Sequence, residues 1–316
     1  MLCIYHLADH DGKGSAAIVG RKFKGVEFFG LNHDMDVPTE EIKKHDKIII
    51  CDISLPMDLM FELNETKDLT WIDHHASMIE EYEKRIASGA KEIKGLRRNG
   101  TAAIMLTWEY FFPDEKAPEG VKLLGLNDIF DLRDYRVRPF EYAFQAMGVN
   151  KPNDQNWKDL LASKLDINEM VSNGMAILSY IKNRNHRLCK AMSFDSEYMG
   201  YKCICANMPQ GYSEFYDGVK NIKEYDFMCN FFMNGKNSWN LSFYTAKDNV
   251  DVSKIASSFG GGGHKKAAGA SGLNKLPEFL EKKYFELNKK YELYIVTNYL
   301  YLEHEPDISS NNLKVR

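Results

Sequence analysis

The sequence predicts an α/β protein of two domains, with a parallel sheet in the N-terminal domain, a smaller C-terminal α/β domain and a cleft between them. Three continuous apolar runs, MLCIYHLAD, KIIICDIS and LTWIDHH, each end in polar residues, which is typical of buried parallel strands. Segments with helical spacing, such as GSAAIVGRKF, alternate with them. We therefore expect a domain over residues 1–150, a helical connector over 151–194, and a second domain with a C-terminal extension over 195–316.

Length and composition indicate a soluble, folded protein. The chain has 316 residues and a mass of 36.4 kDa, and 44% of its residues are hydrophobic, which is enough for two cores. A net charge of -4 argues against a protein that coats long nucleic acid by bulk electrostatics. The N-terminus has no secretory leader, and no apolar run approaches the length needed to span a bilayer. We expect a cytoplasmic protein without membrane contact.

The six cysteines form no CxxC pair, and two of them lie inside apolar runs. This pattern favours reduced thiols in the core over disulfides.

The remaining elements follow from spacing and composition. Residues 100–112, GTAAIMLTWEYFF, predict a helix, whereas LLGLN is interpreted as a further strand that ends in the carboxylates Asp128, Asp131 and Asp134. The pieces YKCICANM, YDFMCNFFM and SWNLSFYT predict strands of the second domain, and a helix is expected to begin near His264. The tail predicts a helix, an aromatic-rich strand and a frayed end.

Acidic and imidazole side chains follow the strands of the N-terminal domain. Ligands of open parallel sheets gather beyond the carboxyl ends of the strands, so these side chains can converge on one pocket. The candidate metal ligands are His6, Asp9, Asp11, Asp52, His74 and either Asp128 or Asp131. An isolated aspartate at a strand end is usually a helix N-cap, but the coincidence over several strands favours a site for two divalent cations.

Four landmarks resemble those of the DHH phosphoesterase superfamily with its DHHA1 accessory domain. They are DHDG at 9–12, Asp52 after an apolar strand, DHH at 73–75, and GGGGHKKAAGAS at 260–271. The resemblance covers roughly residues 1–272. It implies an Mn²⁺-dependent phosphodiesterase or phosphatase that acts on short oligonucleotides or nucleotides. Mg²⁺ or Co²⁺ are alternative ions. Members of the superfamily include nano-RNases (oligoribonucleases), 3'-phosphoadenosine 5'-phosphate phosphatases, cyclic-dinucleotide phosphodiesterases and single-strand-specific exonucleases.

The resemblance also assigns roles. His6 and Asp9 would hold one metal ion, Asp11 and His74 the other, and Asp52 would bridge the two ions. His75 would face the scissile phosphate, and Asp73 would orient the imidazoles by hydrogen bonds from behind. The further acidic ligand stays open: the local D-L pattern favours Asp131, whereas strand-end geometry favours Asp128.

Substrate contacts are expected from two further segments. The glycine motif would contribute Gly261, Gly262, Gly263 and His264, since glycines allow a close backbone approach and a helix N-terminus offers N–H groups to an anion. The segment RRNGTAA would contribute Arg98, or Arg97 in its place, and Thr101. Tyr244 stands near a place where many relatives carry arginine, which favours stacking on a base over pairing with phosphate. His10 is expected to point away from the metals.

Other interpretations stay open at this point. A single-strand-specific DNA or RNA exonuclease, or a cyclic-dinucleotide phosphodiesterase, is one alternative. A nucleotide-binding regulatory protein without turnover is another, and hydrolysis of a non-nucleotide phosphate such as polyphosphate is a third. Homodimerisation through the parallel-sheet domain is a further expectation from the resemblance.

Overall fold

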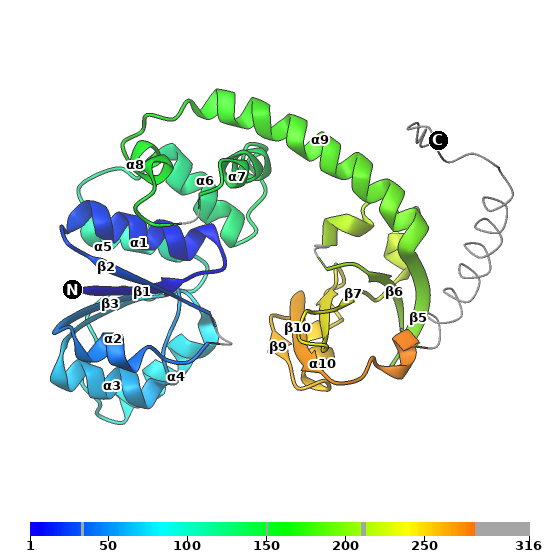
Figure 1. Cartoon of the computed structure of the whole chain (residues 1–316). Coiled ribbons are helices and arrows are strands. Elements are labelled where there is room, and N and C mark those ends of the chain that lie inside the picture. The colour runs from blue at the N-terminus through cyan, green and yellow to red at the C-terminus, as the bar shows by residue number, and fades with distance from the viewer. Residues whose placement is uncertain (33–34, 150, 210–212, 282–316) are drawn as a thin grey trace, which may run out of the picture. The chain divides into compact units, whose positions relative to one another are not determined.

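The computed structural model describes residues 1–32, 35–149, 151–209 and 213–281. The chain divides into two compact units, residues 1–179 and 180–316 (Figure 1). The boundary falls within one long helix, α9, which runs from Ile167 to Met192. The domain limits expected at residues 150 and 194 stay predictions.

The N-terminal unit contains a four-stranded sheet in which all strands are parallel, as the sequence predicts. The order is β2-β1-β3-β4, and the strands are β1 Leu2–His6, β2 Glu27–Leu31, β3 Lys47–Cys51 and β4 Asp68–Ile72. Three of these strands correspond to the apolar runs of the sequence. Strand β2 was not predicted: EFFGL is a short run that a glycine interrupts, and it is only partly buried.

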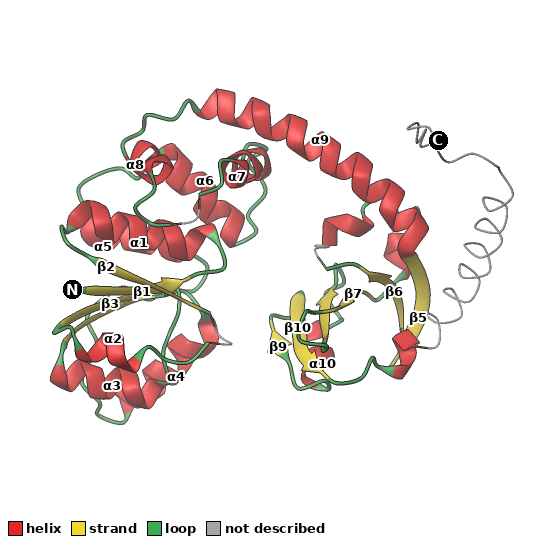
Figure 2. Cartoon of the chain, viewed as in Figure 1, coloured by secondary structure: helices red, strands yellow, loops and turns green. Residues whose placement is uncertain are grey.

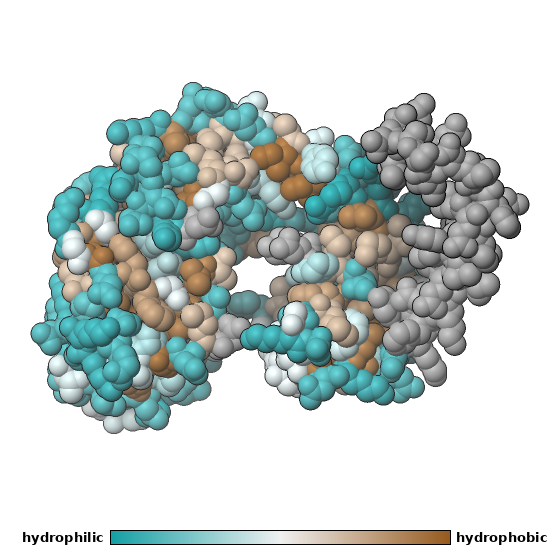
Figure 3. Space-filling view, viewed as in Figure 1, coloured by the Kyte–Doolittle hydropathy of each residue, from teal (hydrophilic) through white to brown (hydrophobic). Residues whose placement is uncertain are grey.

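Helices cover both faces of this sheet (Figure 2). The side chains of Cys3, Ile49 and Cys51 pack into a core with α1 (His10–Lys22) and α5 (Ala103–Phe111). Ile4 and Ile50 pack on the other face with α3 (Met57–Thr66) and α4 (Ala76–Ala87). The outer surface of the helices on the second face is mainly hydrophilic (Figure 3), as expected for amphipathic helices. The helices are α1 His10–Lys22, α2 Thr39–Lys43, α3 Met57–Thr66, α4 Ala76–Ala87, α5 Ala103–Phe111, α6 Glu119–Asp128, α7 Val137–Ala146 and α8 Gln155–Leu161.

One predicted strand is wrong. The run LLGLN lies in helix α6, so Asp128 is the last residue of a helix and not a residue beyond a strand end. Val121 and Leu124, three positions apart, both enter the core shared with α1 and α5. A short apolar run cannot be assigned to strand or helix by periodicity alone, and here the buried face repeats with helical spacing.

The C-terminal unit contains a six-stranded mixed sheet in the order β5-β6-β7-β8-β10-β9. Its strands are β5 Ser193–Tyr198, β6 Tyr201–Asn207, β7 Phe227–Met233, β8 Trp239–Tyr244, β9 Gly262–Gly263 and β10 Ala267–Leu273, with a helix α10 at Val252–Ser257 and short 3₁₀ turns at Ser213–Tyr216 and Ile222–Glu224. The three predicted strands of this domain are confirmed. The expected strand and frayed end of the tail lie outside the described residues.

All six cysteines are buried and none forms a disulfide, which confirms the prediction of core thiols. Cys3 and Cys51 lie in the N-terminal sheet, and the sulfurs of Cys203 and Cys205 are 3.6 Å apart in the C-terminal unit. Among the described residues, no helix combines the length and the apolar composition that crossing a bilayer requires.

Close packing of α9 on α7 gives a first prediction. A Cβ atom added at Gly174 would lie 1.8 Å from the carbonyl oxygen of Pro139, so Gly174→Ala must push the two helices apart. We expect a loss of about 1–3 kcal/mol in the free energy of unfolding, measured by urea denaturation. Gly235→Ala, where the added Cβ meets nothing within 4 Å, is the matched control. Equal stability of the two variants would contradict the packing described here.

Candidate metal centre

The acidic and imidazole side chains gather where the strands of the parallel sheet end. His6 is the last residue of β1, Asp52 directly follows β3, and His74 lies two residues beyond β4. Helix α1 begins directly after β1 and contributes Asp9 at its N-cap and Asp11 in its first turn. Because parallel strands point in one direction, these ends meet at one edge of the sheet.

Three groups of possible ligand atoms overlap at this edge. They are His6 with Asp9 and Asp52, Asp11 with His74 and Asp128, and Asp52 with His74 and His75. In each group the ligand atoms lie within 4.8 Å of one another. Asp52 belongs to two of the groups and stands between the other side chains. This arrangement can hold more than one cation with shared ligands.

The distances within the cluster are those of side chains that could share ions. His6 Nδ1 lies 3.1 Å from Asp9 Oδ2 and 3.5 Å from Asp52 Oδ2. His74 Nε2 lies 3.2 Å from Asp52 Oδ1, 3.6 Å from Asp11 Oδ2 and 3.5 Å from Asp128 Oδ2. Each imidazole therefore faces two or three carboxylate oxygens.

The backbone holds Asp52 in an unusual conformation. Its φ angle is 59°, in the left-handed region, and its amide donates a hydrogen bond to the carbonyl of Ile72 at the end of β4 (3.0 Å). Aspartate and asparagine tolerate this region better than most residues. The turn directs a carboxylate that is 1% exposed into the centre of the cluster.

Backbone N–H groups fix the carboxylate of Asp11. Both of its oxygens accept hydrogen bonds at the start of α5, from Ala103 N at 2.8 Å and from Ile104 N at 2.7 Å. A carboxylate at a helix N-terminus also interacts favourably with the helix dipole. Sequence reasoning missed this contribution of α5, because backbone N–H groups leave no side-chain signature; the only signal is that GTAA precedes a helix.

A glycine brings Asp11 close to the strand. A Cβ atom at Gly12 would lie 2.1 Å from the carbonyl oxygen of His6, so only glycine lets the first turn of α1 pack directly on the end of β1. The carboxylate of Asp9 accepts the N–H of this glycine at 3.0 Å, so Asp9 serves as an N-cap as well as a neighbour of His6.

Asp73 organises the two histidines that follow it. Its side chain is fully buried and accepts hydrogen bonds from His74 N (2.7 Å), His75 N (3.2 Å), His75 Nδ1 (2.7 Å) and Trp71 Nε1 (3.2 Å). The hydrogen bond that His75 donates to Asp73 raises the pKa of His75. Asp73 belongs to none of the ligand groups but positions His74 and His75, which do.

Burial and mutual repulsion raise the pKa values of three carboxylates in the cluster. Burial, followed by the charge of Asp52, raises the pKa of Asp11 well above its usual range. Burial raises the pKa of Asp52 to about 6, and burial together with Asp11 raises that of Asp128 to about 9. For His6, burial lowers the pKa, but hydrogen bonds to Asp52 and Asp9 outweigh it and raise the value to about 10. Without added positive charge, the ionised cluster is unfavourable.

The residues present fit divalent cations. Oδ1 of Asp52 and Oδ2 of Asp128 are buried and have no hydrogen-bond donor in the described part of the chain. Buried oxygens normally have a hydrogen-bond partner. These two lie close to the same nitrogen, His74 Nε2, at 3.2 Å for Asp52 and 3.5 Å for Asp128. Carboxylates mixed with imidazoles suit Mn²⁺, Fe²⁺ or Zn²⁺, and the carboxylates alone suit Mg²⁺.

Asp128 and Asp131, left open by the sequence, are in different surroundings. Asp128 joins the cluster from the C-terminal end of α6. Asp131 lies in the following loop, where Arg133 Nε donates to its Oδ1 at 2.8 Å, and this ion pair lowers the pKa of Asp131 to about 2. The structure therefore brings only the first of them to the other candidate ligands.

The arginine segment has mainly structural contacts. Arg97 donates to the carbonyls of Trp71 and Ile93 at 2.8 Å each, and Arg98 pairs with Glu109 at 2.7 Å on the surface. Thr101 lies two residues before α5 and close in sequence to the N–H groups that bind Asp11.

His10 points away from the cluster, as predicted. Its Nδ1 lies 2.8 Å from Glu141 of α7, and its ring packs edge-on against Phe144 and Trp157.

The glycine motif of the C-terminal unit differs from expectation. No helix begins at His264; it lies in a tight turn between β9 and β10, where its N–H donates to the carbonyl of Ala267 at 2.8 Å. A Cβ at Gly261 would lie 2.1 Å from the carbonyl of Gly269, and Gly263 has φ 139°. The close approach of backbone segments explains why glycine occupies these two positions. Because no helix begins here, the motif offers no helix N-terminus as an anion site.

Gly262 and Tyr244 complete the expected contacts of this unit. A Cβ at Gly262 would meet nothing within 4 Å, so the strand is open at this position. Tyr244 ends β8 and packs partly against a hydrophobic cluster that contains Cys189 and Tyr216.

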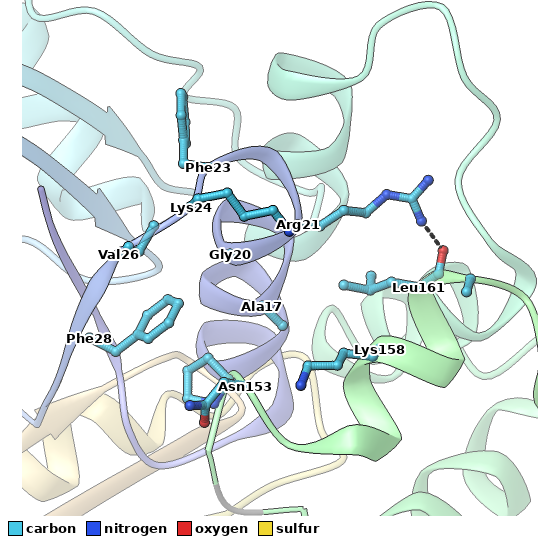
Figure 4. A pocket seen from close by; sticks show the side chains of 13 residues that line it. Ala17, Gly20, Arg21, Phe23, Lys24, Val26, Phe28, Asn153, Lys158 and Leu161 are labelled. Atoms are coloured by element: carbon cyan, nitrogen blue, oxygen red, sulfur yellow. Dashed lines mark hydrogen bonds between the residues drawn. The ribbon is translucent and has the colours of Figure 1, made fainter.

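A pocket of about 470 Å³ lies beside the C-terminal half of α1 (Figure 4). Arg21, Lys24 and Lys158 lie around an apolar floor that includes Phe28. The guanidinium of Arg21 is already bound by the carbonyl of Leu161 and by Glu115. The pocket is at the opposite end of α1 from Asp9 and Asp11, so it is separate from the metal cluster.

A protein-family comparison matches residues 206–288 to the DHHA1 domain. This match covers the sheet from the end of β6 through β10 and includes the motif GGGGHKKAAGAS.

The chain is also similar to a curated protein and to solved structures. It is 29% identical over 297 residues to the uncharacterized protein R106 of Acanthamoeba polyphaga mimivirus; the match covers 84% of this chain and 66% of that protein, so the chain spans about two thirds of its relative's length. A pGpG-specific phosphodiesterase, PggH from Vibrio cholerae, has 10% identity and a TM-score of 0.49, with 94% of this chain and 98% of that one covered. RecJ from Thermus thermophilus, in complex with Mn²⁺, has 13% identity and a TM-score of 0.45, with 92% and 51% covered.

The unpaired carboxylates predict a stability response to metal. Mn²⁺ at a hundredfold excess over its Kd would add about 2.7 kcal/mol and raise the Tm of the N-terminal unit by about 5–10 °C. Asp52→Asn, which suits the left-handed backbone, should unfold without metal at or above the wild-type temperature, since it removes one repelling charge. The Mn²⁺ shift of this variant should fall below about 2 °C.

Asp131→Asn is the matched control, because Asp131 lies outside the cluster. Differential scanning fluorimetry with Mn²⁺ and with EDTA measures both variants. A full Mn²⁺ shift in Asp52→Asn, or its loss in Asp131→Asn, would contradict the ligand set described here.

Proposed function

We propose that the chain is a member of the DHH and DHHA1 phosphoesterase superfamily and that it is a metal-dependent phosphodiesterase or phosphatase. The match of residues 206–288 to the DHHA1 domain supports this proposal. The proposed substrates are short oligonucleotides or nucleotides, and the proposed cofactors are two Mn²⁺ ions, which Mg²⁺ or Co²⁺ could replace.

One observation carries this proposal: three ligand groups overlap at the carboxyl edge of the parallel sheet, two of them sharing Asp52 and two sharing His74. His6 and Asp9 would hold one ion, Asp11, His74 and Asp128 the other, and Asp52 would contact both. Buried carboxyl oxygens without donors, at Asp52 and Asp128, support this assignment, because only a cation or a proton could compensate them.

The ions would supply Lewis acidity at the phosphoryl group and a hydroxide-like nucleophile from water near neutral pH. The remaining steps fall to the chain itself. Asp73 accepts the Nδ1 proton of His75, which fixes the orientation of this ring and the position of Nε2. We propose that His75 faces the scissile phosphate and donates a proton, directly or through a water, to the leaving oxygen.

The substrate would be small. A net charge of -4 does not suit an enzyme that follows a long polyanion by bulk electrostatics. In the DHHA1 domain, the exposed turn at Gly262 and His264 is the proposed substrate contact of that unit. Pairing of two chains stays a prediction, for which the mass in solution is the test.

Hydrolysis of a small panel tests the function. The panel contains 5'-pApA, a longer oligoribonucleotide, short single-stranded DNA, 3'-phosphoadenosine 5'-phosphate, cyclic dinucleotides and polyphosphate, each with Mn²⁺, Mg²⁺, Co²⁺ or EDTA. We expect Mn²⁺-dependent cleavage that is fastest for a dinucleotide or nucleotide and absent in Asp52→Asn. Binding of a nucleotide without cleavage of any substrate would favour the regulatory alternative and overturn the proposed enzymatic function.

Replacement of Asp73, which positions His75, should reduce activity without abolishing it. Asp73→Asn keeps the size of the side chain but reverses the hydrogen bond to His75 or breaks it, so kcat/KM should fall by about 10–100-fold. The variant should also need more Mn²⁺ for half-maximal activity, a change that loss of folded protein would not produce. Asp134→Asn, at a surface ion pair with Arg136, is the control and should keep full activity.

A further inference from the structure

Phe130 has an unusual backbone for an aromatic residue. It lies just after α6, its φ angle is 57°, and 62% of the residue is exposed. A bulky side chain with a positive φ angle is rare and strained. Such strain persists when the surrounding structure enforces it, and it is concentrated at functional sites.

The end of helix α6 requires this backbone conformation. Phe130 N donates to the carbonyl of Asn127 at 3.1 Å, and Asp131 N donates to that of Leu126 at 2.9 Å. This is the Schellman pattern, in which the left-handed position is usually glycine. The fold therefore needs the left-handed backbone here but does not need a phenyl ring.

Burial does not explain the ring either. The guanidinium of Arg138, on α7, lies 5.7 Å from the ring centre. Arg138 is itself held by Asn127, whose Oδ1 accepts from its Nη1 at 3.1 Å. The guanidinium thus lies over the ring of Phe130, and the residue keeps most of its surface exposed.

Phe130 is close along the chain to a residue of the metal cluster. Phe130 follows Asp128 by two residues, so the backbones of the two are within about 7 Å, and Asp128 contacts His74 in the cluster. A molecule whose phosphate lies at the cluster could extend a flat group over the ring. Bases stack on aromatic side chains in this way without regard to sequence.

We propose that Phe130 is a specificity-determining residue that stacks on a nucleobase of the substrate. The inference rests on the proposed function and goes further, because it assigns base recognition to the N-terminal unit and favours nucleotides over polyphosphate. The ring replaces the glycine that the helix end would prefer, so stability and substrate binding have opposite requirements at this position.

The test compares Phe130→Gly with Ser163→Gly. Ser163 occupies the same Schellman position after α8: its φ angle is 54°, its N–H donates to Leu160, and Lys164 N donates to Asp159. Both variants should raise Tm by about 2–4 °C, because glycine relieves the same strain. Only Phe130→Gly should lower kcat/KM for 5'-pApA with Mn²⁺, by about tenfold to a hundredfold. Phe130→Trp should keep the wild-type value.

A second substrate separates stacking from other effects. It is the same dinucleotide without bases, in which 1',2'-dideoxyribose replaces both nucleosides. Wild type should prefer 5'-pApA over it, and Phe130→Gly and Phe130→Ala should lose that preference with unchanged kcat/KM for the base-free substrate. Equal losses on both substrates, or none, would overturn the role of Phe130. If wild type cleaves no phosphate ester with Mn²⁺, the proposed function fails instead.

Discussion

Mutual repulsion among buried carboxylates is the constraint on which the N-terminal unit depends. Asp11, Asp52 and Asp128 lie around His74 with little access to water, and apolar packing alone would not keep them together. The parallel sheet brings the ends of β1, β3 and β4 to one edge. Helix α5 contributes two N–H groups, which stabilise one of these charges before any cation binds. Much of the local architecture therefore compensates for a site that opposes folding.

Two residues with positive φ angles show the same conflict between stability and the site in their backbone conformation. Asp52 turns the chain at the end of β3, and Phe130 closes α6; each has a side chain where a glycine would cost less. Asp52 belongs to the cluster, and Phe130 follows Asp128 of the cluster by two residues. Stability is supplied elsewhere, by the two apolar layers on the faces of the sheet and by close glycine contacts such as that at Gly174.

Much of the site could be predicted because strand ends are visible in sequence. The apolar runs at 2–6, 47–51 and 68–72 end at His6, Asp52 and the DHH motif, so parallel pairing alone predicts that these residues meet. Asp128 is harder to place, because it reaches the cluster from a helix whose apolar run has the appearance of a strand. The backbone donors at Ala103 and Ile104 have no side-chain signal. The glycine motif has the composition of a ligand loop, but its spacing is explained in part by two strands in close contact.

The burial of all six thiols makes the cysteines reporters of motion. An alkylating reagent can reach Cys3 or Cys51 only when the N-terminal sheet opens, and Cys203 or Cys229 only when the C-terminal sheet opens. The order in which they react under native conditions therefore ranks the opening free energies of the two units within one chain. Cation binding at the edge of the first sheet would slow labelling of the first pair and leave the second pair unchanged, which separates local protection from global stabilisation.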